Sequence, residues 1–120
     1  MNKKTVVIGA SENPERYSYK AVEKLSLYGH SVIAIGRSEG AINEIKIQTG
    51  TPFLTGIDTV SLYLSPENQE SIMDYIVNLK PKRIIFNPGT ENPKLEKFAQ
   101  SKGIQTIEGC TLVMLSTNQY

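Results

Sequence analysis

The sequence predicts an α/β fold, a single doubly wound, Rossmann-like domain around a mainly parallel sheet of five or six strands. Two patterns indicate this fold. Short apolar runs alternate with segments of helical period along the whole chain, and a turn of small residues follows the first apolar run. The 120 residues suffice for one core and are too few for a nucleotide domain plus a separate substrate domain. We therefore expect residues 1–120 to form one domain.

The first third of the chain begins with a strand at Thr5–Gly9, which is apolar as expected for a strand covered on both faces. A helix is predicted from about Tyr19 to Tyr28, because an apolar stripe recurs there and a glycine follows it. The second strand is Ser31–Ile35. The pattern then becomes mixed, with a turn around Gly40–Asn43 and a weakly alternating strand at Glu44–Gln48.

The strand pattern returns at Thr59–Leu64, and a helix follows it. Ser65 and Pro66 are typical of a helix N-cap and first helical position. The apolar residues Ile72, Tyr75, Ile76 and Leu79 then fall on one helical face, which predicts a helix of about 14 residues lying on the sheet.

The last third repeats the same alternation. Arg83–Asn87 is predicted as a strand, and Asn92-Pro93 begins a helix that Gly103 ends. Gln105–Ile107 is the last clear strand. Cys110–Ser116 is expected to form a short apolar turn or helix against the sheet edge.

Right-handed crossovers would give these strands the order 3-2-1-4-5-6, with the chain reversing direction between the first and fourth strands. Ligands of such sheets bind at that reversal, beyond the carboxyl ends of the strands. The segments at four of these ends are small, polar or basic, and we expect them to line one crevice: Gly9-Ala10-Ser11, Gly36-Arg37, Leu64-Ser65-Pro66 and Asn87-Pro88-Gly89.

The turn after the first strand indicates phosphate binding. Gly9, Ala10 and Ser11 would let a ligand approach the backbone, and the helix starting at about Ser18 would offer free N–H groups and the positive end of its dipole. Ser11 and Pro14 stand where the usual G-x-G-x-x-G pattern has its second and third glycines, so the glycine match alone is weak. The expected ligand carries a pyrophosphate.

Two arginines are candidate phosphate ligands. Arg37 follows the second strand, where NAD-binding folds place an acid for the ribose hydroxyls, so the cation favours the 3′-phosphate of coenzyme A (CoA) or the 2′-phosphate of NADP. Arg16 could clamp a pyrophosphate bidentately, or pair with Glu12 or Glu15 at the surface.

The run Gly9-Ala10-Ser11 with Asn13, Arg16, Ser18 and Tyr19 resembles the opening motif of the stand-alone CoA-binding domain family, which shares its fold with the CoA-binding domain of succinyl-CoA ligase. Asn87-Pro88-Gly89-Thr90-Glu91-Asn92 falls where that family has a second loop, and Gly109-Cys110-Thr111-Leu112 where it has a cysteine. The resemblance implies that Ser18 and Tyr19 lie beside the ligand and that the second loop contacts the pantetheine arm. It also implies that Cys110 lies near the thiol, where a mixed disulfide with CoA is chemically possible.

Charge and composition exclude other classes. The chain has 13 basic and 12 acidic residues, a net charge of +1 and no long basic run, so we expect no nucleic-acid partner. It has no apolar run long enough to span a membrane and no secretory signal, so we expect no membrane partner and a cytoplasmic location. One cysteine and one histidine are poor material for a metal site.

The sequence thus predicts a module that binds CoA or an acyl-CoA, with no visible catalytic machinery. An NADP-binding reductase or sensor subunit and a protein-interaction module with an empty nucleotide crevice remain as alternatives, and a protein partner or homodimer stays open. The predicted ligand-binding residues are Gly9, Ala10, Ser11, Asn13, Arg16, Ser18, Tyr19, Gly36, Arg37, Ser65, Pro66, Asn87, Pro88, Gly89 and Cys110.

Overall fold

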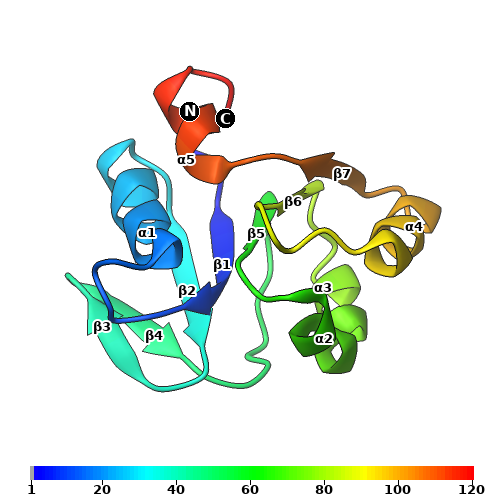
Figure 1. Cartoon of the computed structure of the whole chain (residues 1–120), viewed down its shortest axis with the longest axis horizontal. Coiled ribbons are helices and arrows are strands. Elements are labelled where there is room, and N and C mark those ends of the chain that lie inside the picture. Colours follow the sequence, from blue (N-terminus) through cyan, green and yellow to red (C-terminus); the bar gives the residue numbers. More distant parts are fainter. Residues whose placement is uncertain (1) are drawn as a thin grey trace.

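A computed structural model describes residues 2–120, which form one seven-stranded sheet flanked by helices (Figure 1). The sheet order is β3-β4-β2-β1-β5-β6-β7, and every neighbouring pair is parallel except β3 and β4. The strands are β1 (Thr5–Ala10), β2 (Val32–Gly36), β3 (Gly40–Ile42), β4 (Ile45–Gln48), β5 (Thr59–Leu62), β6 (Arg83–Phe86) and β7 (Gln105–Glu108).

The predicted fold class is confirmed, with one strand more than expected. Residues predicted as a turn around Gly40–Asn43 instead form β3, which pairs antiparallel with β4 at the edge of the sheet. Asn43, with a φ of 53°, begins the short connection to β4. The order therefore differs from 3-2-1-4-5-6 by this added edge strand, and the other six strands follow the predicted order.

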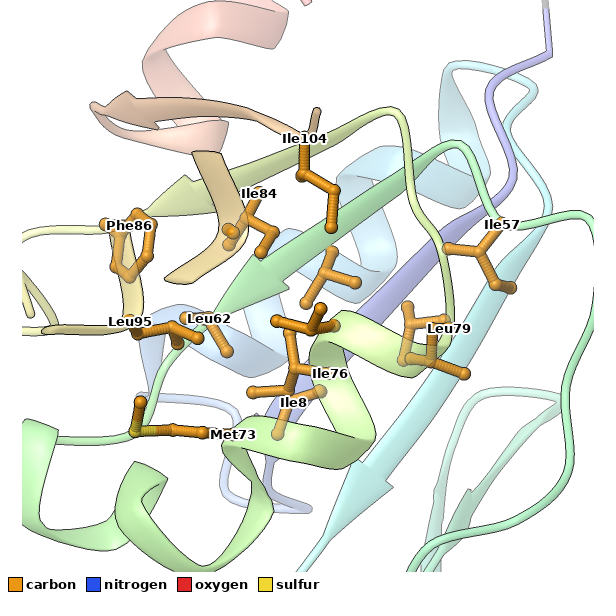
Figure 2. Packing of buried hydrophobic residues seen from close by; sticks show 14 of the residues in the cluster. Ile8, Ile57, Leu62, Met73, Ile76, Leu79, Ile84, Phe86, Leu95 and Ile104 are labelled. Atoms are coloured by element: carbon orange, nitrogen blue, oxygen red, sulfur yellow. The ribbon is translucent and has the colours of Figure 1, made fainter. Parts of the chain in front are cut away.

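Helices cover both faces of the sheet. Successive residues of a strand point to opposite faces, so each apolar strand supplies side chains to a core on either side. On one face, Val7 packs in an apolar cluster with Val22 and Leu25 of α1 and Leu115 of α5. On the other, Ile8 and Leu62 pack against Ile76, in the cluster shown in Figure 2. The helical segments are α1 (Tyr17–Leu27), α2 (Pro66–Gln69), the 3₁₀ turn η1 (Glu70–Ile72), α3 (Met73–Asn78), α4 (Pro93–Ser101) and α5 (Thr111–Ser116).

The segment after β5 is less regular than its apolar period suggests. The single predicted helix of about 14 residues is divided into α2, the 3₁₀ turn and α3, although Ile76 is fully buried against the sheet as expected. The start of α4 matches the prediction, because the Asn92 side chain accepts a hydrogen bond from the Leu95 N–H at 3.3 Å. Within residues 2–120, no helix is both long enough and apolar enough to cross a bilayer.

Candidate ligand-binding crevice

Two adjoining cavities lie beyond the carboxyl ends of β1, β2 and β5. The larger has a volume of about 680 Å³ and a largely polar wall, formed by Gly9, Ala10, Ser11, Glu12, Asn13, Arg16, Tyr17, Ser18, Arg37, Ser38, Glu39, Tyr63, Leu64, Ser65 and Asn68. The smaller has a volume of about 290 Å³ and is lined by Ile8, Gly9, Ile35, Gly36, Arg37, Gly50, Thr51, Leu64, Asn68 and Ile72.

The two cavities form one crevice with a polar part and an apolar part. Gly9, Arg37, Leu64 and Asn68 line both of them. Among residues 2–120, Arg37 is the one charged residue of the smaller cavity, whose other walls are aliphatic side chains, glycines and short polar residues. This crevice lies where β1 meets β2 on one side and β5 on the other, which is the reversal point of the sheet.

Glycine at position 9 is required by the packing of the strands. Its φ of +100° is rarely adopted by other residues, and a Cβ there would lie 2.9 Å from the backbone carbonyl carbon and oxygen of Tyr63. The N–H of Tyr63 donates to the carbonyl of Ile8 at 2.8 Å, which holds the two chains at this separation. Gly9 therefore shapes the crevice wall as well as the turn that follows.

Gly36 permits a similar close approach between β2 and β1. A Cβ on Gly36 would lie 2.4 Å from the carbonyl oxygen of Ala10. The pairing of β1 with β2 also shifts register between Ile8 and Ala10, so Gly9 is bypassed. The carboxyl ends of the two strands are thus brought together at the mouth of the crevice.

The amino end of α1 opens into the larger cavity. Arg16 is the N-cap residue, no side chain of residues 2–120 caps the helix and no acidic residue lies in its first turn. The first N–H groups of α1 therefore have no partner inside the helix. Tyr17 and Ser18 from this turn line the cavity, and Ser18 does so although only 4% of its surface is exposed. This arrangement favours an anion.

The loop between β1 and α1 is held by its own polar side chains. The Asn13 N–H donates to Ser11 Oγ at 3.1 Å, and the Glu15 N–H donates to Asn13 Oδ1 at 3.0 Å. The Arg16 N–H donates to the Asn13 carbonyl at 3.0 Å. These bonds form a compact Asx-type turn that carries Arg16 to the edge of the cavity.

Arg16 and Arg37 line the larger cavity and are exposed. The salt bridges within residues 2–120 join Lys82 to Asp58 and Lys94 to Glu70, so neither arginine pairs with a carboxylate in this part of the chain. Both arginines thus line the same cavity as the start of α1. Guanidinium groups suit the geometry of phosphate oxygens.

The structure brings nine of the predicted residues together and leaves six outside both cavities. Those inside are Gly9, Ala10, Ser11, Asn13, Arg16, Ser18, Gly36, Arg37 and Ser65. Those outside are Tyr19, Pro66, Asn87, Pro88, Gly89 and Cys110. Tyr19 packs against the apolar cluster between α1 and the sheet.

The loop after β6 is organised by internal hydrogen bonds. Asn87 is 1% exposed, and its Nδ2 donates to Ser61 Oγ at 2.9 Å and to the Leu62 carbonyl at 2.8 Å. The Asn87 carbonyl accepts from the Thr90 N–H at 2.9 Å, and Gly89 has a φ of +91°. Pro88 followed by glycine in such a turn matches a type II turn. The Asn87 side chain thus serves the fold, whereas Gly89 is exposed.

Cys110 is half-buried and occupies the N-cap position of α5. Nearby, the hydroxyl of Tyr63 is buried and has no hydrogen-bond partner within residues 2–120. Burial raises the pKa of Tyr63 above its ordinary value, so its hydroxyl is a neutral group at physiological pH. Tyr63 also lines the larger cavity and was not among the predicted site residues.

The larger cavity has six further residues that the sequence does not predict: Glu12, Tyr17, Ser38, Glu39, Tyr63 and Asn68. Most are sequence neighbours of predicted residues in the same loops. Asn68 had a usable signal, because it follows Ser65 by about one helical turn and therefore lies on the same side of that segment. Its Nδ2 donates to Ser65 Oγ at 3.1 Å.

The fold and the crevice define a Rossmann-like domain, a class of fold in which ligands bind beyond the carboxyl ends of parallel strands. The profile of a family described as a CoA-binding domain matches residues 3–116, and the chain belongs to this family.

Solved structures agree with the fold. One is a crystal structure of an uncharacterised protein that is 47% identical, with a TM-score of 0.97, over 100% of this chain and 99% of that one. A hypothetical protein from Pyrococcus horikoshii is 20% identical, with a TM-score of 0.86, over 96% of this chain and 82% of that one. A protein from Thermus thermophilus is 16% identical, with a TM-score of 0.85, over 98% of this chain and 91% of that one. A search of curated proteins gave no match.

Proposed function

We propose that this protein binds CoA or an acyl-CoA in the two-part crevice. The observation that carries the proposal is that Arg16 and Arg37, without carboxylate partners in residues 2–120, share one cavity with the uncapped start of α1. CoA carries a pyrophosphate and a separate ribose phosphate, and therefore needs more than one cationic contact. Membership of a CoA-binding domain family supports the same ligand.

Each part of the ligand has a region of matching chemistry. The pyrophosphate is assigned to the larger cavity, beside Ser11, Arg16 and the first turn of α1. The adenine is assigned to the smaller cavity, between aliphatic side chains such as Ile35 and Ile72. Arg37 lines both cavities, so it is placed to contact the 3′-phosphate between them.

The pantetheine arm is assigned to the remaining polar wall and the exit from the larger cavity. Ser65 lies on that wall, and Pro66 begins α2 directly after it. We propose that the arm continues toward Gly89 and Cys110, which follow β6 and β7 at the same carboxyl edge of the sheet. Gly89 is exposed and Cys110 is half-buried.

We propose a binding module rather than an enzyme. The chain has one histidine, His30, and it precedes β2 at the amino edge of the sheet, away from the crevice. Its Nδ1 accepts a hydrogen bond from the Lys3 N–H at 2.9 Å. An acid–base role at the crevice therefore has no imidazole to perform it.

Thermal unfolding with a panel of ligands tests the proposal. A ligand that binds only the folded protein stabilises it by RT ln(1 + [L]/Kd), about 2.7 kcal/mol at a hundredfold excess over Kd. We expect CoA to raise the Tm clearly and NAD to leave it unchanged. A shift with NADP and none with CoA would favour the reductase or sensor alternative, since Arg37 also suits a 2′-phosphate. No shift with any nucleotide would favour an interaction module.

A further inference from the structure

A single side chain connects the loop before α1 to the edge strand β3. Glu12 lies in that loop and lines the larger cavity. Its Oε2 accepts a hydrogen bond from the N–H of Ala41 in β3 at 3.0 Å. The Glu12 carboxylate therefore bridges two segments that are 29 residues apart in the sequence.

Gly40 makes room for this bridge. A Cβ on Gly40 would lie 2.3 Å from Glu12 Cδ, 2.6 Å from Glu12 Cγ and 2.6 Å from Glu12 Oε1. Gly40 is not one of the glycines with a positive φ. Glycine is thus needed at position 40 because it has no side chain, and not because of a special backbone conformation. The Glu12 side chain occupies the space that a Cβ would fill.

The bridge also directs one carboxylate oxygen of Glu12 toward β3 rather than toward the cavity arginines. Glu12 precedes Arg16 by four residues and shares the cavity with Arg37, yet its Oε2 is bonded to a backbone N–H. No salt bridge joins Glu12 to either arginine in the described part of the chain. Turning Oε2 toward a guanidinium would cost this charge-assisted hydrogen bond.

We propose that Glu12 is a positioning residue of the phosphate site: it fastens the loop of residues 11–16 to β3 and so presents Ser11, Arg16 and the start of α1 to the ligand. This inference rests on the proposed function. It does not require Glu12 to touch CoA. Its contribution is to reduce the freedom that the loop would otherwise lose when the ligand binds.

The chain offers a matched control. Glu23 of α1 accepts a hydrogen bond from Asn43 Nδ2 at 3.2 Å, and so ties the turn between β3 and β4 to α1. Glu23 is exposed and lines neither cavity. Glu23→Ala should therefore loosen the β3–β4 hairpin without altering the loop of residues 11–16.

Calorimetric titration with CoA of the wild-type protein and of Glu12→Ala, Glu12→Gln, Gly40→Ala and Glu23→Ala tests the inference. We expect Glu12→Ala and Gly40→Ala each to weaken binding about tenfold or more, the loss typical of one charge-assisted hydrogen bond. Glu12→Gln should retain most of the affinity, because its amide oxygen still accepts from Ala41. Glu23→Ala should bind as the wild type does.

The double variant Glu12→Ala/Gly40→Ala distinguishes loss of the bridge from a general folding defect. Once Glu12 is alanine, the three atoms nearest to a methyl group at position 40 are gone, so Gly40→Ala should have no further effect on CoA affinity in the Glu12→Ala background. Additive losses would overturn the inference, as would wild-type affinity of Glu12→Ala or an equal loss in Glu23→Ala. If the wild-type chain itself fails to bind CoA, the proposed function is overturned and this inference falls with it.

Discussion

The side chain of Asn87 accepts a hydrogen bond from the N–H of Thr111 at 2.8 Å, and so joins the end of β6 to the first residue of α5. The same amide donates to Ser61 and Leu62 on β5. Ser61 Oγ and Thr111 Oγ1 are also bonded, at 2.8 Å. This buried network determines where α5, and with it Cys110, lies relative to the sheet.

We predict that Asn87→Ala destabilises the protein. The substitution leaves the Thr111 N–H and the Leu62 carbonyl without this partner in a buried setting, where each unsatisfied group costs about 1–3 kcal/mol. Urea unfolding followed by circular dichroism measures the change. Asn68→Ala is a control, because Asn68 is exposed and its side chain donates to Ser65 alone. Equal stability of wild type and Asn87→Ala would contradict the structural role.

Two glycines with similar φ values should respond differently to alanine. Gly9→Ala incurs both a positive φ and a 2.9 Å contact with the Tyr63 backbone, whereas Gly89→Ala incurs a positive φ alone, because nothing lies within 4 Å of its added Cβ. The backbone cost is about 1–2 kcal/mol in each case. Gly9→Ala should therefore be the more destabilising of the two in thermal unfolding. A larger loss of stability in Gly89→Ala would show that the Tyr63 backbone shifts readily to accommodate a methyl group at position 9.

Arg37→Met should weaken CoA much more than dephospho-CoA, because the proposed contact is with the ribose phosphate that dephospho-CoA lacks. Loss of a charge-assisted bond of about 1.5–3 kcal/mol corresponds to a roughly 10- to 150-fold decrease in affinity. Calorimetry with both ligands measures the ratio. Arg16→Met is the comparison: it should affect both ligands alike, because both carry the pyrophosphate. Equal losses in Arg37→Met would mean that Arg37 does not contact the ribose phosphate.

Cys110 should form a mixed disulfide when the protein is incubated with CoA disulfide. The Cys110 thiolate attacks one sulfur of the reagent, the mixed disulfide forms, and one CoA leaves as its thiolate. Intact-protein mass spectrometry should show one added CoA that a reductant removes and that is absent in Cys110→Ser. A protein that reacts with a small thiol reagent and never with CoA disulfide would place Cys110 away from the pantetheine path.

Acidification should destabilise the protein through His30. Burial, followed by positive charges that include Lys3 and Arg83, lowers the pKa of His30 below its ordinary value of 6.5. The unfolded chain therefore binds the proton more readily, so stability falls as the pH drops below about 6.5 toward the folded pKa. His30 is the one histidine, and NMR can follow its titration directly. His30→Gln should flatten this pH dependence, and an unchanged slope would contradict the assignment.

Much of the fold could be predicted because the strands that form its centre are buried on both faces and read as apolar runs. Strand β3 could not, since it has only three residues and its antiparallel partner was itself a weak signal. The 3₁₀ turn at Glu70–Ile72 leaves the apolar period intact and therefore has no signature in the sequence.

For the site, too, local sequence patterns carry a prediction, whereas contacts between residues distant in the sequence do not. That loop residues such as Ser11 and Arg37 line one crevice could be predicted, because strand ends on one edge of the sheet converge there. Asn87 was predicted as a ligand residue, but its side-chain partners come from β5 and α5, which a local pattern does not reveal. From the sequence, Glu12 is only a possible surface partner for Arg16, because its bond to Ala41 depends on β3, which the sequence does not predict.

Because Gly9 and Arg37 border both cavities, a ligand that spans them makes its two sets of contacts after a single loss of translational and rotational freedom. Separate halves would each incur that loss. Adenosine 3′,5′-bisphosphate and phosphopantetheine added together should therefore bind far more weakly than CoA at equal concentration, although they present nearly the same groups. Selectivity for CoA over its breakdown products would then follow from the continuity of the two cavities, and would need no additional contact.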